Sequence, residues 1–130
     1  MRPPLHAPLA LGLVAVALAT SACGGGSSLD LSPQGASGRK IAATNGCSSC
    51  HGSSGEGGVG PPFVGLSGSD REFTDAPPTI ADEAYLSESI KDPGAKRVLG
   101  YSARMPDNSL DDDEIADVIA YIRELQDVAP

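Results

Sequence analysis

The chain has 130 residues, which is enough for one domain, and its formal net charge is −8. A chain this acidic is not expected to bind nucleic acid or an anionic membrane surface. It contains 16 Gly, 11 Pro, no Trp and only 4 % aromatic residues, so its core must be thin. Small domains with thin cores usually need a staple such as a bound metal.

The N-terminus predicts export. A positive start at Arg2 precedes an apolar run over residues 7–19, which is too short to span a bilayer comfortably but typical of a signal peptide. The run ends in Thr20-Ser21-Ala22-Cys23, which resembles a bacterial lipobox, although Thr20 stands where leucine is most common. The resemblance implies a lipoprotein-type signal peptide over residues 1–22 and a lipid attached to Cys23. An ordinary signal peptide would instead leave Cys23 as a free thiol.

Residues 24–36 are rich in Gly and Ser and show no hydrophobic period, so residues 23–36 are expected to be a flexible linker. The folded domain is then expected over residues 37–127, with a short tail at 128–130. Ser37 is a candidate N-cap for a first helix through residue 45. Gly38 and Ala42 share one face of that helix, and their small size would let another helix approach closely.

The chemistry of the chain is concentrated at Cys47-Ser48-Ser49-Cys50-His51. Two cysteines separated by two residues and followed by histidine are the attachment signature of a c-type haem. Each thiol adds to one vinyl group of the porphyrin, and the next imidazole can ligate the iron.

Three other interpretations of this motif compete. A redox pair needs a βαβ context, of which the sequence shows no sign. A zinc site needs about four ligands, but only two cysteines and one histidine follow the signal segment. A plain disulfide would not require His51.

Residues 52–76 should form a long loop, because Gly and Pro leave no helical period there. Such a loop could wrap one edge of the haem. Thr79 and Asp82 resemble a capping box for a second helix, which should end after Lys91 because Pro93 follows. Leu86 and Ile90 lie on one face of this helix and are expected to form core and haem wall.

Met105 is the only methionine besides the initiator, and it lies in a polar loop between Arg104 and Pro106. A core methionine would normally lie in an apolar stripe, whereas a thioether is a neutral, soft ligand suited to haem iron. The only other histidine, His6, leaves with the signal segment. Met105 is therefore the predicted sixth ligand.

The last helix is the best-defined element. Asp111 and Glu114 have the spacing of a capping box, and an acidic first turn suits the positive end of a helix. A 3.6-residue period runs through Ile115, Val118, Ile119, Ile122 and Leu125.

Taken in order, these motifs resemble a class I monohaem cytochrome c over residues 37–126. The resemblance implies an all-α fold, in which three or more helices and long Gly/Pro-rich loops surround one covalently bound haem c. It also implies that Cys47 and Cys50 hold the haem, that His51 and Met105 ligate the iron, and that the Pro61 carbonyl accepts the His51 ring N–H.

A closer resemblance covers residues 81–93 and 100–106, which are similar to the cytochrome c domain fused to subunit II of some haem–copper oxidases. The chain lacks the transmembrane hairpin of that subunit and the cysteines of its binuclear copper centre. We therefore expect a free-standing, lipid-tethered version of the domain on the extracytoplasmic face of a bacterial membrane.

The expected function is one-electron transfer in a respiratory chain and not enzymatic catalysis. The resemblance implies a quinol-oxidising complex or dehydrogenase as donor and a terminal oxidase as acceptor. Four basic residues near Met105 are expected to face a partner protein: Lys91, Lys96, Arg97 and Arg104. Two alternatives remain open, a sensory haem protein or weak peroxidase in which Met105 is displaced, and a fixed subunit of a larger complex.

Overall fold

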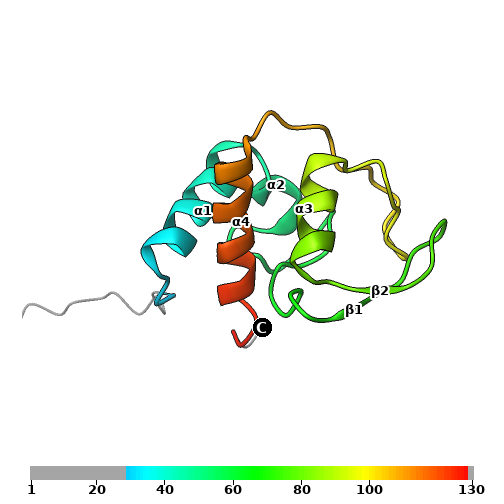
Figure 1. Ribbon diagram of the computed structural model, residues 1–130, viewed down its shortest axis with the longest axis horizontal. Helices are drawn as coiled ribbons and strands as arrows, with labels where there is room; N and C mark the ends of the chain where they lie inside the picture. The colour runs from blue at the N-terminus through cyan, green and yellow to red at the C-terminus, as the bar shows by residue number, and fades with distance from the viewer. Residues whose placement is uncertain (1–28, 129–130) are drawn as a thin grey trace, which may run out of the picture.

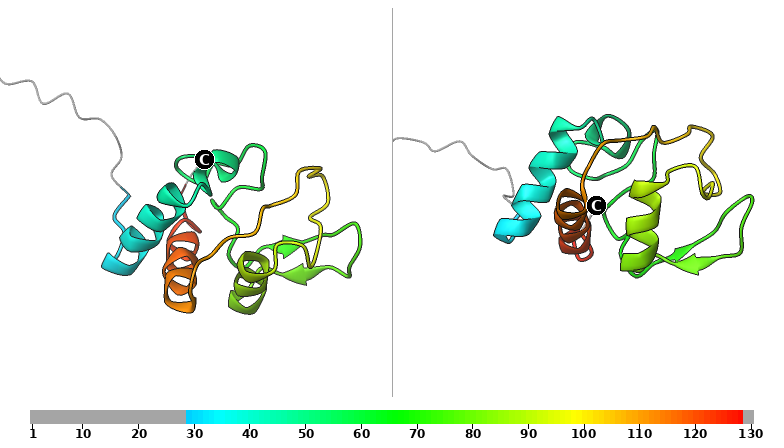
Figure 2. Two further views of the ribbon diagram at one scale, coloured as in Figure 1. Left: turned by 90° about the horizontal axis from the view of Figure 1, so that it is seen from above. Right: turned by 45° about the horizontal axis from the view of Figure 1, so that its top comes forward.

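The computed structural model describes residues 29–128, and their structure is mainly helical. Three longer helices, α1 (Pro33–Thr44), α3 (Glu83–Lys91) and α4 (Asp112–Glu124), lie with α4 between the other two (Figures 1 and 2). A single turn, α2 (Ser48–His51), follows α1. The prediction of an all-α fold is confirmed.

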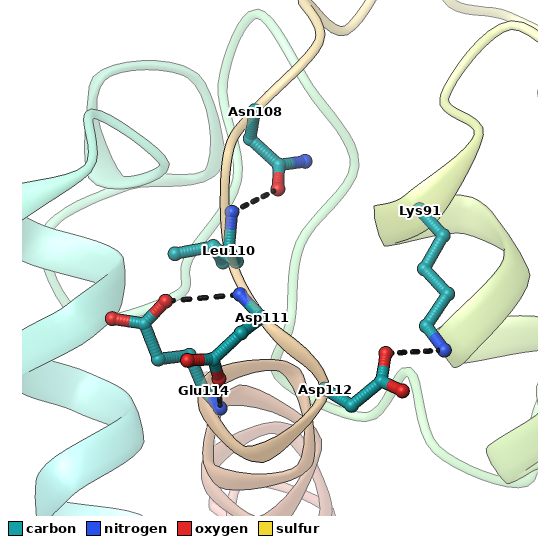
Figure 3. A network of polar contacts seen from close by, with 6 residues as sticks. All are labelled: Lys91, Asn108, Leu110, Asp111, Asp112 and Glu114. Carbon is teal, nitrogen blue, oxygen red and sulfur yellow. Dashed lines mark hydrogen bonds and ion pairs between the residues drawn. The ribbon is translucent and has the colours of Figure 1, made fainter.

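Helix α4 begins as its sequence predicts. The Glu114 amide donates to Asp111 Oδ1 at 2.9 Å, and the Asp111 amide donates to Glu114 Oε2 at 3.0 Å, so both bonds of the capping box form (Figure 3). The predicted apolar face is buried, and the core gathers around it. The core residues of α4 and its end are Ile115, Val118, Ile119, Tyr121, Ile122 and Leu125.

Helix α1 begins five residues earlier than predicted, so the expected linker end at residue 36 and the expected cap at Ser37 are wrong. The N-cap is Ser32, whose Oγ accepts from the Gly35 amide at 3.0 Å, and Pro33 occupies the first helical position, which suits its fixed φ. Ser37 lies inside the helix and donates from Oγ to Asp117 Oδ2 at 2.7 Å.

Gly35, which lies in the predicted linker, and Gly38, which lies in the predicted helix, both pack against α4. A Cβ atom on Gly35 would overlap the Glu124 carboxylate, and one on Gly38 would overlap the Asp117 carbonyl oxygen. With Ala42 only 1 % exposed, the small face of α1 lets the two helices cross at close range, as predicted.

The predicted loop over residues 52–76 contains a strand, β1 (Asp70–Arg71), which pairs with β2 (Thr79–Ile80) in a short antiparallel hairpin, with Arg71 opposite Thr79. Thr79 therefore does not cap α3. Asp82 is the cap, and its Oδ1 accepts from the Tyr85 amide at 2.8 Å. The hairpin lies at the end of the domain away from α1 (Figure 1).

Within residues 29–128 no helix has the length and apolar character needed to cross a membrane.

Candidate cofactor site

The two cysteines of the motif are brought together by a single helical turn. The Cys50 and His51 amides donate to the Cys47 carbonyl at 3.2 and 3.0 Å, which closes the turn of α2 directly after α1. Residues three apart in a helix lie on the same face, so Cys47 and Cys50 both line one cavity. Both thiols are half-buried and neither takes part in a disulfide.

His51 is held by its ring nitrogen. The Nδ1 atom lies 2.7 Å from the Pro61 carbonyl oxygen, and since a carbonyl only accepts, Nδ1 carries the proton. The lone pair of the neutral imidazole is then on Nε2, the nitrogen left available to a metal. The backbone of the Pro61 loop is itself tied to the motif, because the Gly60 amide donates to the Cys50 carbonyl at 2.9 Å.

Phe63 supports the imidazole from its face. The two rings are stacked, with centroids 4.4 Å apart and an interplanar angle of 17°. Tyr121 of α4 meets Phe63 edge-on, with centroids 6.3 Å apart. The orientation of His51 is therefore fixed by a hydrogen bond on one side and by an aromatic stack that reaches into the core.

Burial shifts the titration of both groups of the motif. Burial lowers the pKa of His51, and the hydrogen bond to the Pro61 carbonyl only partly offsets this, so the neutral, metal-binding form is favoured. Burial also raises the pKa of Cys47, with a smaller opposing effect from its own backbone and a further increase from Cys50. The Cys47 thiol is therefore protonated at neutral pH.

The cavity has a volume of ≈ 280 Å³ and is lined from several elements. Leu86 and Ile90 of α3, both buried, form part of its wall, and Met105 reaches it from the loop before α4. The structure thus brings together every predicted site residue that it describes: Cys47, Cys50, His51, Pro61, Leu86, Ile90 and Met105. Cys23 and the predicted signal peptide lie outside the described residues.

These residues fit a covalently bound haem better than the other interpretations of the motif. No three His, Cys, Asp or Glu side chains of residues 29–128 gather as a metal-binding group, which removes the zinc site from the described part of the chain. The secondary structure of that same part contains no βαβ unit. Two thiols on one face, an oriented imidazole and aliphatic walls suit a covalently attached haem.

The family model for cytochrome c matches residues 35–126, and the chain belongs to the cytochrome c family. None of the curated proteins matches it. Membership implies a covalently held haem c and haem-based electron transfer, and Cys47 and Cys50 have the spacing that attachment needs.

Two residues of the site were not singled out from the sequence. Phe63 is one of just 2 Phe in the chain and lies two residues after Pro61, and this position could have drawn attention to it. Arg71 lines the cavity from β1. No local sequence pattern predicts this position, because the strand is only two residues long.

Proposed function

We propose that this protein is a respiratory one-electron carrier whose haem is held by Cys47 and Cys50 and ligated by His51 and Met105. The observation that carries the proposal is that His51 and Met105, the single His and Met of residues 29–128, line the same cavity as both cysteines. Bound haem supplies a one-electron iron couple. The chain supplies the ligands, their orientation and the apolar surroundings.

The hydrogen bond between His51 and Pro61 supports the role of His51 as a ligand. Its Nδ1–H donates to the Pro61 carbonyl, which fixes the tautomer and makes Nε2 a better donor to iron. A thioether as the other ligand raises the reduction potential and closes the remaining coordination position. With both positions filled there is no open site for substrate, so electron transfer is favoured over catalysis.

The proposed redox partners and location are supported by sequence resemblance. Residues 81–93 and 100–106 are similar to the cytochrome c domain of some haem–copper oxidase subunits, which supports a terminal oxidase as acceptor and a quinol-oxidising complex or dehydrogenase as donor. The lipobox-like segment ending at Cys23 supports a lipoprotein on the extracytoplasmic side of a bacterial membrane.

One observation favours the ligand-binding alternative. No residue of the Met105 segment, defined as residues 94–109, is buried, and the segment contains no helix or strand. A ligand presented from so exposed a segment can be displaced more easily than one on a packed helix.

Met105→Ala tests the axial ligation. The haem should stay attached, because attachment depends on the cysteines, but the iron should bind carbon monoxide readily and the reduction potential should fall. The oxidised protein should also lose the weak charge-transfer band at the red end of the visible spectrum that a methionine–iron bond gives in this family. Ser102→Ala is the matched control, since Ser102 is exposed in the same segment and does not line the cavity.

Two results would count against the proposal that the protein is a one-electron carrier. A Met105→Ala protein that keeps its six-coordinate low-spin spectrum and its potential would show that Met105 is not the ligand. A parent protein that binds carbon monoxide as fast as Met105→Ala would favour the sensory alternative.

The membrane anchor is tested separately by Cys23→Ser. The variant should leave the membrane fraction with its spectrum unchanged, because the proposed tether and the haem cavity share no residues. Retention on membranes after a salt wash would assign anchoring to an uncleaved signal segment or to a protein partner.

A further inference from the structure

The Met105 segment is joined to the hairpin (residues 70–80) by backbone pairing that lies outside the two strands. Phe73 forms an isolated antiparallel bridge with Val98. Two backbone hydrogen bonds of 2.9 Å flank this bridge, from the Thr74 amide to the Arg97 carbonyl and from the Leu99 amide to the Glu72 carbonyl. The hairpin and the segment lie side by side in Figures 1 and 2, and the segment is therefore fixed to the hairpin around Val98.

A side chain of the hairpin adds a further bond at the same place. Asp75 Oδ1 accepts from the Arg97 amide at 2.9 Å. Asp75 is exposed and takes no part in the ion pairs of residues 29–128. A hydrogen bond to an ionised carboxylate is stronger than one between neutral groups. Asp75 therefore strengthens the link between the hairpin and the first part of the Met105 segment.

The hairpin is itself anchored in the core. The Phe73 ring packs on Tyr85 of α3, with centroids 5.8 Å apart, and Tyr85 is buried. At the base of the hairpin, the amide of the buried Ala81 donates to the Ser69 carbonyl at 2.8 Å. Val98 lines the cavity, whereas Phe73 does not. Support for the Met105 segment thus runs from α3 through Phe73 to Val98, along a path outside the cavity.

The chain on either side of Met105 has few bonds of its own. Among residues 29–128, no hydrogen bond involves residues 102–107. The next tie after Val98 and its turn is Asn108, whose Nδ2 donates to the Ile90 carbonyl at 2.7 Å. Met105 lies between these two ties. Loss of the tie at Val98 would lengthen the unsupported stretch and so widen the range of positions open to the thioether.

We propose that Phe73 and Asp75 are positioning residues for Met105, which hold the hairpin against the Met105 segment and limit how often the thioether leaves the iron. This inference rests on the ligation of iron by Met105 in the proposed function, and it requires neither a respiratory role nor a lipid anchor. Cyanide can bind the oxidised iron only after the thioether has left. The rate of cyanide binding therefore reports how often the segment opens.

The first test uses the intact haem protein and truncates the anchor. Phe73→Ala should speed cyanide binding to the oxidised protein by roughly tenfold, because it removes the aromatic contact with α3, and Phe73→Leu should speed it less. Hydrogen exchange of the Leu99 amide should accelerate in parallel. Ile41→Ala is the matched control, since Ile41 is also partly buried against the core but does not line the cavity. That variant should lose stability and keep the cyanide rate of the parent.

The second test separates the hydrogen bond of Asp75 from its charge, because Asp75 also lines the cavity. Asp75→Ala removes both and should speed cyanide binding a few-fold. Asp75→Asn removes the charge but keeps an oxygen that can accept from the Arg97 amide, so it should keep the rate of the parent. Asp70→Ala removes the same charge from an exposed position on β1 that does not line the cavity, and it should have no effect.

The proposal is overturned if Phe73→Ala and Asp75→Ala bind cyanide at the rate of the parent, or if Ile41→Ala binds it as fast as Phe73→Ala, because opening would then be global. An Asp75→Asn protein as fast as Asp75→Ala would overturn the role of Asp75, since charge alone would explain its effect. Circular dichroism shows whether each variant is folded; if Phe73→Ala is not, Phe73→Leu and Asp75→Ala decide.

Met105→Ala distinguishes a failure of this inference from a failure of the proposed function. If Met105→Ala binds cyanide no faster than the parent, Met105 is not the ligand and both fail. If Met105→Ala binds cyanide faster while the hairpin variants do not, the ligation stands and only the positioning role of the hairpin is overturned.

Discussion

The α1–α4 crossing and the Met105 segment support the same cavity by different means. At the crossing, helices meet through Gly35, Gly38 and Ala42, all buried, and the cysteine motif follows directly. The Met105 segment has no buried residue, and its ties include the hydrogen bond from Asn108 Nδ2 to the Ile90 carbonyl at 2.7 Å. The cysteine side of the cavity is thus ordered by protein packing. We expect the order of the Met105 segment, on the other side, to depend on the bound haem.

The largest effect is expected at the crossing. Gly38→Ala places a Cβ against the Asp117 carbonyl, a backbone atom that cannot rotate away, so the helices must separate. Overpacking of this kind typically costs about 1–3 kcal/mol, and the better helix propensity of alanine offsets less than about 1 kcal/mol. Thermal unfolding should therefore occur roughly 10 °C lower.

The matched control is Gly94→Ala in the Met105 segment. Gly94 does not have a positive φ, and a Cβ there would meet only Asp92 Oδ1 at 3.6 Å, an ordinary contact. Its unfolding temperature should stay close to that of the parent. Equal losses in the two variants would show that the crossing is no more tightly packed than the loop.

A smaller effect is expected from Asn108→Ala, which removes the bond to the Ile90 carbonyl in the last turn of α3 and the bond that Asn108 Oδ1 accepts from the Leu110 amide at 3.2 Å (Figure 3). The partly buried bond to Ile90 should account for about 1 kcal/mol in the free energy of unfolding, and the exposed bond to Leu110, which water can replace, for little more. If Met105 ligates the iron, its segment should then open more often, and the oxidised protein should bind cyanide a few-fold faster. Stopped-flow absorbance measures that rate.

Asn45→Ala is a control of the same chemistry at the end of α1, on the cysteine side of the cavity. Asn45 Nδ2 donates to the Ile41 carbonyl at 3.0 Å, also near the end of a helix. This substitution should change stability by a similar or smaller amount and leave the cyanide rate unchanged. A rate increase shared by both variants would mean that opening is global and does not begin in the Met105 segment.

The elements that could be predicted from the sequence are those whose causes are local. The capping box of α4 acts over three residues, the apolar period of α4 repeats along one helix, and the cysteine motif is a single turn. The stop of α3 after Lys91 likewise follows from a proline two residues later.

The features that were missed depend on residues far apart in the chain. Gly35 indicated a linker because the reason for its small size lies in Glu124, which only packing brings near. The hairpin was missed because a two-residue strand shows no alternation.

The ion pairs of the basic residues near Met105 were also not predicted. Lys91 and Lys96 lie within the expected basic docking segment, but the structure pairs them with Asp112 and Glu88 (Figure 3 shows the first pair). Their contribution to a positive surface is therefore reduced. Arg97 and Arg104 are exposed and outside the ion pairs of residues 29–128, so they remain the better candidates for contact with a partner.

If the domain is held through its N-terminal side, as we propose, the Glu124 carboxylate determines how a pulling force enters it. It accepts from the Ser32 amide at 2.8 Å and from Ser32 Oγ at 2.6 Å, so the first residue before α1 is fastened to the end of α4. A force applied to the chain before Ser32 would act first on the two Ser32–Glu124 hydrogen bonds and then on the α1–α4 crossing at Gly38. The hairpin, at the end of the domain away from α1, would bear little of the force (Figure 1).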